Sequence, residues 1–189
     1  VVPWQKSRGQ LLMKMIGHDG EPFYGNPREV LKSVSQKVSD TGFKAVVAVE
    51  IEFFLTDLKR HQWQSPRPAR SPESGQRENE GHLYSLASLD DYNPFFQEIY
   101  AAAEKQEIPI YTALSELSPG QFEINLHHVP DALDACDHAV MLKRIIRSIA
   151  NKHKMEATFM PKIFPDQPGN GMHIHFSLLD SKGENVFQG

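Results

Sequence analysis

The feature that most constrains this chain is an alternating segment near its C-terminal end, which reads Met172-His173-Ile174-His175-Phe176-Ser177-Leu178. Side chains of a β-strand point to opposite faces in turn. A strand at this place carries His173, His175 and Ser177 on one face and four apolar side chains on the other. The segment therefore predicts a strand that packs its apolar face on a core and presents imidazoles on the other face.

Carboxylates repeat this alternation in two earlier segments. Glu50 and Glu52 share one face of a predicted strand whose other face is apolar. Segment 121–127 places Glu123 opposite three apolar side chains in the same way. Glu116 precedes a Ser-Pro-Gly turn, and a hairpin at that turn brings Glu116 towards Glu123.

A divalent cation is the simplest explanation for these acids. Two carboxylates at positions i and i+2 of a strand lie roughly 6–7 Å apart. In a partly buried site they repel each other unless a cation lies between them. Carboxylate oxygens with at most one imidazole suit Mg²⁺ or Mn²⁺, whereas structural zinc sites hold more Cys or His. Each pattern alone also fits a solvated strand edge, but the three together favour one shared metal-lined surface.

Composition excludes several classes of protein. The 189 residues carry 20 basic and 24 acidic side chains, without a basic stripe for nucleic acid and without an apolar run of membrane-spanning length. Cys136 is the only cysteine, so an internal disulfide is excluded, and with no signal peptide we expect a cytoplasmic protein. The chain begins with Val1 rather than Met, and we expect it to be a piece of a longer protein.

Several further elements are predicted from periodicity and capping. We expect a strand over residues 11–16, and a helix that begins after the N-cap Asn26 and has an apolar stripe. Residues 59–85 are rich in Pro, Ser and charge and predict a long flexible loop. Another helix is predicted over residues 92–106.

The longest predicted helix covers residues 130–152. Its spacing predicts five buried side chains, namely Leu133, Cys136, Val140, Ile146 and Ile149. We expect His138 and His153, in or near this helix, to lie on the surface.

The chain resembles the glutamine synthetase family. Four signature segments occur in the family's order and approximate spacing: Glu50-Ile-Glu52, Glu116-Leu-Ser-Pro-Gly-Gln-Phe-Glu123, Ala157-Thr-Phe-Met-Pro-Lys162 and Gly169-Asn-Gly-Met-His173-Ile-His175-Phe-Ser-Leu178. The resemblance runs from about Pro3 to Phe187. Segment 122–128 and the segment that begins at Asp134 look closer to the branch that joins glutamate to polyamines such as putrescine.

The resemblance implies an α+β fold, in which a curved antiparallel sheet is flanked by helices. Residues 1–189 then form part of the family's catalytic domain, without its small N-terminal domain and without the later half of the catalytic domain. We therefore expect the 189 residues alone to be inactive as a ligase.

Eight positions match functional residues of the family. The implied ligands of the metal ion on the amino-acid side are Glu52, Glu116 and Glu123. The implied ligands of the ion that bridges the nucleotide phosphates are Glu50 and His173. His175 and Ser177 match the nucleotide side of the pocket, and Gly169 matches a backbone contact to the amino acid.

The implied reaction is transfer of the ATP γ-phosphoryl group to the γ-carboxylate of glutamate, followed by attack of ammonia or an amine. Two ions, Mg²⁺ or Mn²⁺, offset the repulsion between the two anionic substrates. The family also assembles into rings of identical subunits. One departure concerns specificity, because Pro168 stands where glutamine synthetases commonly have an Asn that holds glutamate, and Asn170 follows two residues on.

Three alternatives to a glutamate–ammonia ligase stay open. The chain could belong specifically to a γ-glutamylpolyamine synthetase, or to a non-catalytic metal-binding or structural relative. A structural descendant has no reason to keep mutually repelling carboxylates, which argues against the second alternative. A small cupin-like metal protein is disfavoured because cupins gather more imidazoles around one ion.

Overall fold

A computed structural model describes residues 1–58 and 64–188 of the chain. Its elements in chain order are α1 (Pro27–Asp40), β1 (Lys44–Asp57), α2 (Leu86–Asp91), α3 (Asn93–Glu104), β2 (Ile110–Ser115), β3 (Gln121–Leu126), α4 (Ala132–Lys152), β4 (Met155–Thr158) and β5 (Met172–Leu179). The five strands form one sheet in which all pairings are antiparallel.

The long strand β1 organises the sheet. β3 pairs along one edge of β1, while β5 and β4 pair one after the other along its opposite edge. β2 completes the sheet by pairing with β3 across the short turn 116–120. The predicted hairpin is confirmed, since the backbone N–H of Glu116 donates to Gln121 O at 2.9 Å.

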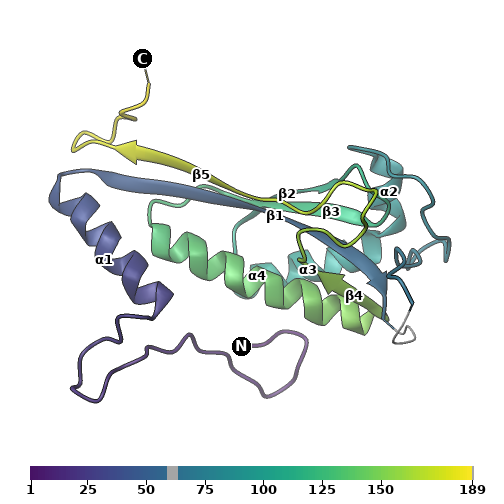
Figure 1. Cartoon of the computed structure of the whole chain (residues 1–189), viewed down its shortest axis with the longest axis horizontal. Coiled ribbons are helices and arrows are strands. Elements are labelled where there is room, and N and C mark those ends of the chain that lie inside the picture. The colour runs from purple at the N-terminus through teal and green to yellow at the C-terminus, as the bar shows by residue number, and fades with distance from the viewer. Residues whose placement is uncertain (59–63, 189) are drawn as a thin grey trace.

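Helices α3 and α4 cover one face of this sheet (Figure 1). The core between them is aliphatic and aromatic, and its largest fully buried side chains include Phe53, Phe95, Phe122, Ile145 and Ile146. The predicted α+β class, with an antiparallel sheet flanked by helices, is confirmed. The opposite face of β1 and β3 is thereby left for polar side chains.

Local capping explains where the two long helices begin. The Asn26 side chain accepts a hydrogen bond from Arg28 N, and Pro27 opens α1, as predicted. Asp131 caps α4 by accepting from Leu133 N at 2.7 Å and from Asp134 N. The helix therefore begins at Ala132, two residues later than predicted, because its N-cap is the aspartate after Pro130.

Several expectations about the elements are wrong. Residues 11–16 form no strand; apart from one bridge between Ile16 and Pro22, this segment is irregular. Helix α1 forms as predicted, but its apolar stripe is not buried, and Val30 and Val34 are both half-exposed. An apolar pattern in a segment does not ensure that another element packs against it. The helices that form the core, α3 and α4, pack their apolar faces on the sheet and not on these two segments.

The prediction for α4 is right for Ile146 and Ile149 and wrong for Val140, which is 57% exposed, while Leu133 and Cys136 are only partly buried. Ala135, Ala139, Leu142 and Ile145 fill the buried face instead. His153 is not a surface residue, because its side chain is mostly buried and its Nε2 lies 3.2 Å from Glu98 Oε1. His138 is also partly buried, and no hydrogen-bond partner reaches its Nδ1 within the described residues.

The apolar face of β5 differs from the prediction. Met172, Ile174 and Phe176 are each more than half exposed, because β5 lies at the sheet edge and the core helices pack under β1 and β4. This strand therefore forms as expected from its alternation, but the described chain does not supply the surface that would cover it.

The expected long loop falls partly outside the described residues, which omit 59–63. Its remainder, residues 64–85, packs against the sheet: Ala69 and Ser71 are buried, and Ala69 O accepts from the buried Tyr92 hydroxyl at 2.9 Å. Among the described helices, none combines the length and apolar character that a membrane crossing requires.

Candidate metal centre

Strand register brings the predicted acids onto one surface. Residues opposite each other in antiparallel strands share a face of the sheet. On β1, Glu52 lies opposite Glu123 of β3, and Glu50 lies opposite His173 of β5. The three strands thus place these four side chains on the face away from α3 and α4.

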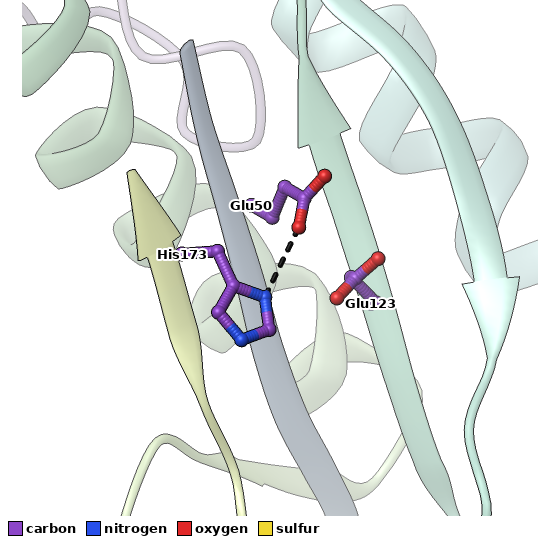
Figure 2. Close-up of side chains that lie close together, drawn as sticks. All are labelled: Glu50, Glu123 and His173. Atoms are coloured by element: carbon purple, nitrogen blue, oxygen red, sulfur yellow. Dashed lines mark hydrogen bonds and ion pairs between the residues drawn. The ribbon is translucent and has the colours of Figure 1, made fainter. Parts of the chain in front are cut away.

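Three of these residues form a compact group. One possible ligand atom each from Glu50, Glu123 and His173 lies within 4.8 Å of the other two. Figure 2 shows the three side chains converging from three neighbouring strands. This group contains implied ligands of both ions. Glu123 is an implied ligand of the ion on the amino-acid side, and Glu50 and His173 are implied ligands of the ion that bridges the phosphates.

Glu50 holds both imidazoles of β5. Its Oε2 lies 3.1 Å from His173 Nδ1, and its Oε1 lies 2.8 Å from His175 Nε2. His175, expected on the nucleotide side, is therefore also a direct neighbour of the acid cluster. These contacts orient both rings towards β1, although the His173 side chain stays 62% exposed.

Glu52 is oriented by two donors. Its Oε2 accepts from the backbone N–H of Gly171 and from Gln121 Nε2, each at 3.0 Å. A Cβ placed on Gly171 would lie 2.9 Å from the other oxygen, Oε1, and 3.4 Å from His173 Nε2. The glycine therefore leaves space beside the two predicted ligands.

Burial and neighbouring acids raise the pKa of two predicted ligands. The pKa of Glu123 is raised by burial and then by the negative charges of Glu50, Glu116 and Glu52, against a hydrogen bond from Asn125. The pKa of Glu116 is raised by burial and by Glu52. Ionised carboxylates are therefore unfavourable here without added positive charge, which fits a divalent cation and oxygen ligands.

A cleft of about 320 Å³ adjoins the acids. Its lining comprises Ala48, Glu50, Tyr111, Asn125, Leu126, His127, His128 and His175. The cleft begins at the side of Glu50 that faces His175, so a molecule in the cleft lies next to the acid cluster.

The two remaining predicted site residues make internal contacts. Ser177 Oγ donates to Asn185 Oδ1 at 2.8 Å, away from the acid cluster on the strand. The carbonyl oxygen of Gly169 accepts from Gln121 Nε2, and a Cβ on Gly169 would overlap the carbonyl of Pro161. Packing alone therefore requires the glycine, and its role towards a substrate stays a prediction.

Sequence reasoning gave no site role to Gln121 and Asn125, and it named Asn170 only as the amide two residues after Pro168. Gln121 and Asn125 alternate with apolar residues on β3 and share the face of Glu123, so the pattern that revealed Glu123 contained the signal for both. Asn170 lies outside any strand, so alternation says nothing about where its side chain points. Its Nδ2 donates to the backbone carbonyls of Thr158 and Met160.

The chain is similar to known proteins over most of its length. Residues 24–189 match the family described as glutamine synthetase, catalytic domain. The chain is 43% identical over 178 residues to the gamma-glutamylputrescine synthetase PuuA of Escherichia coli, a match that covers 94% of the chain and 38% of that relative. A glutamate–isopropylamine ligase of a Pseudomonas species is 34% identical, with 99% of the chain and 40% of the relative covered.

A solved structure gives the same result for the fold. The complex of GmaS with ADP superposes with a TM-score of 0.76 at 31% identity, covering 90% of this chain and 37% of that one. The chain spans about two fifths of the length of the relatives that it matches. By sequence and by fold, the chain belongs to the glutamine synthetase family.

Proposed function

We propose that this chain provides the metal-binding surface of an ATP-dependent ligase that joins glutamate to ammonia or an amine. The observation that carries the proposal is the convergence of Glu50, Glu123 and His173 from three strands, within a segment that matches the glutamine synthetase catalytic domain. A structural relative that binds no metal is less well supported, because buried, mutually repelling acids destabilise a protein that binds no cation.

The proposed ligands are those expected from the family resemblance. Glu52, Glu116 and Glu123 would hold one ion, and Glu50 and His173 the other. Mg²⁺ or Mn²⁺ at these positions supplies the positive charge that lets two anionic substrates approach and that stabilises charge in the transferring group. The chain contributes orientation: Glu50 fixes the imidazoles of β5, and Gly171 N fixes one oxygen of Glu52.

The proposed reaction has two chemical steps. The γ-phosphorus of ATP bonds to a γ-carboxylate oxygen of glutamate as its bond to the β-phosphate oxygen breaks, which gives ADP and an acyl phosphate. The amine nitrogen then attacks the carbonyl carbon of this acyl phosphate, inorganic phosphate leaves as its bond to that carbon breaks, and the nitrogen loses a proton. The proposed location of ATP is the cleft beside His175.

Among amine substrates we favour a polyamine such as putrescine, with ammonia as the runner-up. The relative at 43% identity carries the name gamma-glutamylputrescine synthetase. Pro168, which stands where glutamine synthetases commonly have an Asn that holds glutamate, also supports an amino-acid site that differs from theirs. Asn170 does not replace the missing amide, because its side chain is occupied by Thr158 O, Met160 O and Gln121. We further propose a cytoplasmic protein that assembles into a ring of identical subunits.

Manganese titration tests the metal-binding proposal. A ligand at 100 times its Kd stabilises a protein by about 2.7 kcal/mol, which corresponds to a rise of about 5–10 °C in melting temperature at this chain length. We expect this rise for the unsubstituted chain and for Glu104→Gln, an exposed acid on α3. Glu50→Gln should abolish it. A flat response of the unsubstituted chain would instead support the non-catalytic relative.

The choice of amine is tested by phosphate release from ATP in the presence of Mg²⁺ and glutamate. The assay applies to a protein that carries these residues within a chain of the relatives' length. Faster release with putrescine than with ammonia supports the polyamine assignment. Faster release with ammonia favours the runner-up.

A further inference from the structure

Gln121 has more polar contacts than any predicted metal ligand. Its side chain is 2% exposed, although glutamine is a polar residue that usually lies at the surface. Its Nε2 lies 3.0 Å from Glu52 Oε2, 3.0 Å from Gly169 O and 3.2 Å from Asn170 Oδ1. Its Oε1 accepts from Ser118 N at 3.3 Å.

These contacts fix which end of the amide faces Glu52. Three acceptors surround the nitrogen, and a backbone N–H faces the oxygen, so the reversed orientation would set oxygen against oxygen. The orientation of Asn170 is fixed in the same way, because two backbone carbonyls face its Nδ2. Both amides therefore have a single favourable orientation.

The consequence for Glu52 is that its two oxygens are no longer equivalent. Oε2 receives hydrogen bonds from Gln121 Nε2 and Gly171 N. Oε1 faces the space that a side chain at position 171 would fill, next to His173 Nε2. A carboxylate held through one oxygen presents the other in a defined direction, which reduces the entropy lost when a ligand atom binds.

The same amide also ties Glu52 to the segment 168–171. Gln121 binds the carbonyl of Gly169, and Ser118 Oγ donates to Pro168 O at 3.3 Å. The segment that carries the predicted glutamate contact is therefore anchored to the strand that carries the predicted metal ligands.

We propose that Gln121 is a positioning residue that aims Glu52 Oε1 at the metal ion and couples this ligand to the segment 168–171. The inference rests on the proposed function, since it assigns Glu52 as a ligand. It goes further in naming a residue that acts on the ion only through a ligand. Hydrogen-bonded partners of metal ligands typically change metal affinity about 10–100-fold when substituted.

A purely structural role for Gln121 makes a different prediction. Removing its hydrogen bonds then lowers the melting temperature but leaves the Kd for Mn²⁺ unchanged. The positioning role requires the Kd itself to change, and requires that change to depend on Glu52. Both quantities are measurable on the 189-residue chain.

The test is Gln121→Met, which keeps the length of the side chain and removes its donor. We expect the Kd for Mn²⁺, measured by calorimetric titration, to rise at least about tenfold. Gln121→Asn is the second variant, because it keeps a buried amide but withdraws the nitrogen by about 1.5 Å. Ile51→Val is the control: it alters a buried side chain next to Glu52 on the opposite face, costs about 0.5–1.5 kcal/mol and should leave the Kd unchanged.

Gln121→Met is then repeated in a protein that carries Glu52→Gln, which completes a double-mutant cycle for the two residues. If Gln121 acts through Glu52, Gln121→Met changes the Kd for Mn²⁺ by less than about threefold in the protein that already carries Glu52→Gln. An unchanged Kd in both Gln121 variants, while the unsubstituted chain binds Mn²⁺, overturns the inference and leaves the proposed function intact. If the unsubstituted chain itself does not bind Mn²⁺, both fail.

Discussion

Glu123 shows at the residue scale how this surface depends on a cation. It is 6% exposed and lies directly opposite Glu52 across the β1–β3 pair. Like charges directly opposite in a sheet cost about 0.2–1 kcal/mol. Burial raises the pKa of Glu123, so folding shifts this carboxyl towards its protonated form. The stability associated with this group is present below the pKa of an unfolded carboxyl and is lost as the pH rises through the raised folded pKa.

Glu123→Gln should therefore stabilise the chain in the absence of metal. We expect its melting temperature in EDTA at pH 7 to exceed that of the unsubstituted chain by about 2–4 °C, the effect of 1 kcal/mol at this length. The difference should shrink as the pH falls below the pKa of an unfolded carboxyl, because Glu123 is then protonated in both the folded and the unfolded chain. Thermal melts at several pH values measure this.

Manganese should reverse the order of the two proteins. With Mn²⁺ the unsubstituted chain gains stability and the variant does not, because the variant lacks a ligand oxygen charge. Glu104→Gln serves as the control for a generic change of charge. A variant that is less stable than the unsubstituted chain in EDTA at pH 7 would contradict the view that Glu123 is destabilising without metal.

The sequence predicts correctly which side chains share a face when they belong to the same strand. Alternation alone places Glu50 with Glu52, and His173 with His175, on common faces. It does not reveal that His175 pairs with Glu50, since this depends on the register between β1 and β5. It also misses Gln121, whose partner Glu52 lies 69 positions away in the chain.

At the scale of elements, the loop 64–85 supports the β2–β3 turn. Gly120 N donates to Glu78 Oε2 at 2.7 Å. Tyr84 N donates to Ser115 O at 2.9 Å, and Ser115 Oγ donates to His82 O at 3.0 Å. The turn carries Glu116 at its start, so the loop holds one predicted metal ligand in place from outside the sheet.

Glu78→Ala should loosen this turn. A hydrogen bond to a charged group contributes about 1.5–3 kcal/mol, and at the lower limit the melting temperature should fall by about 3–6 °C. Glu80→Ala, an exposed acid two residues on, should change it by less than about 1 °C, because surface substitutions away from such contacts have small effects. Equal effects of the two substitutions in thermal melts would show that the loop does not support the turn.

Elements were predictable where local chemistry defines their ends. Asn26-Pro27 marks the start of α1, and the acid-rich alternation marks β1 and β3. Segment 11–16 has a strand-like composition, but a strand needs a neighbour, and only Ile16 has a bridging partner. The side chain of Val140 follows the helical period but lies at the margin of the buried stripe of α4, which small alanines occupy instead.

At the scale of the whole molecule, the two faces of the sheet have different roles. The face under α3 and α4 holds the apolar core, and the other face holds the acids and imidazoles. The exposed apolar side chains of β5 and α1 lie outside that core. The sequence predicts the division of the faces, because strand parity is local, but not these uncovered surfaces, because cover depends on contacts between distant elements.

The charge balance of the site leads to the last prediction, that the 189-residue chain alone does not turn over ATP. The largest charge effects on the pKa of Glu116 and Glu123 come from other acids and from His173, and among the described residues no lysine or arginine forms an ion pair with the four acids of the site. Phosphoryl transfer develops negative charge that basic side chains and metal ions together stabilise, so bound metal without such side chains is insufficient. A coupled assay with ATP, Mg²⁺, glutamate and putrescine should therefore detect no phosphate release, while the same preparation binds Mn²⁺. Steady release that Glu50→Gln abolishes would contradict this, because it would show that the acids, the imidazoles and the metal suffice for the chemistry.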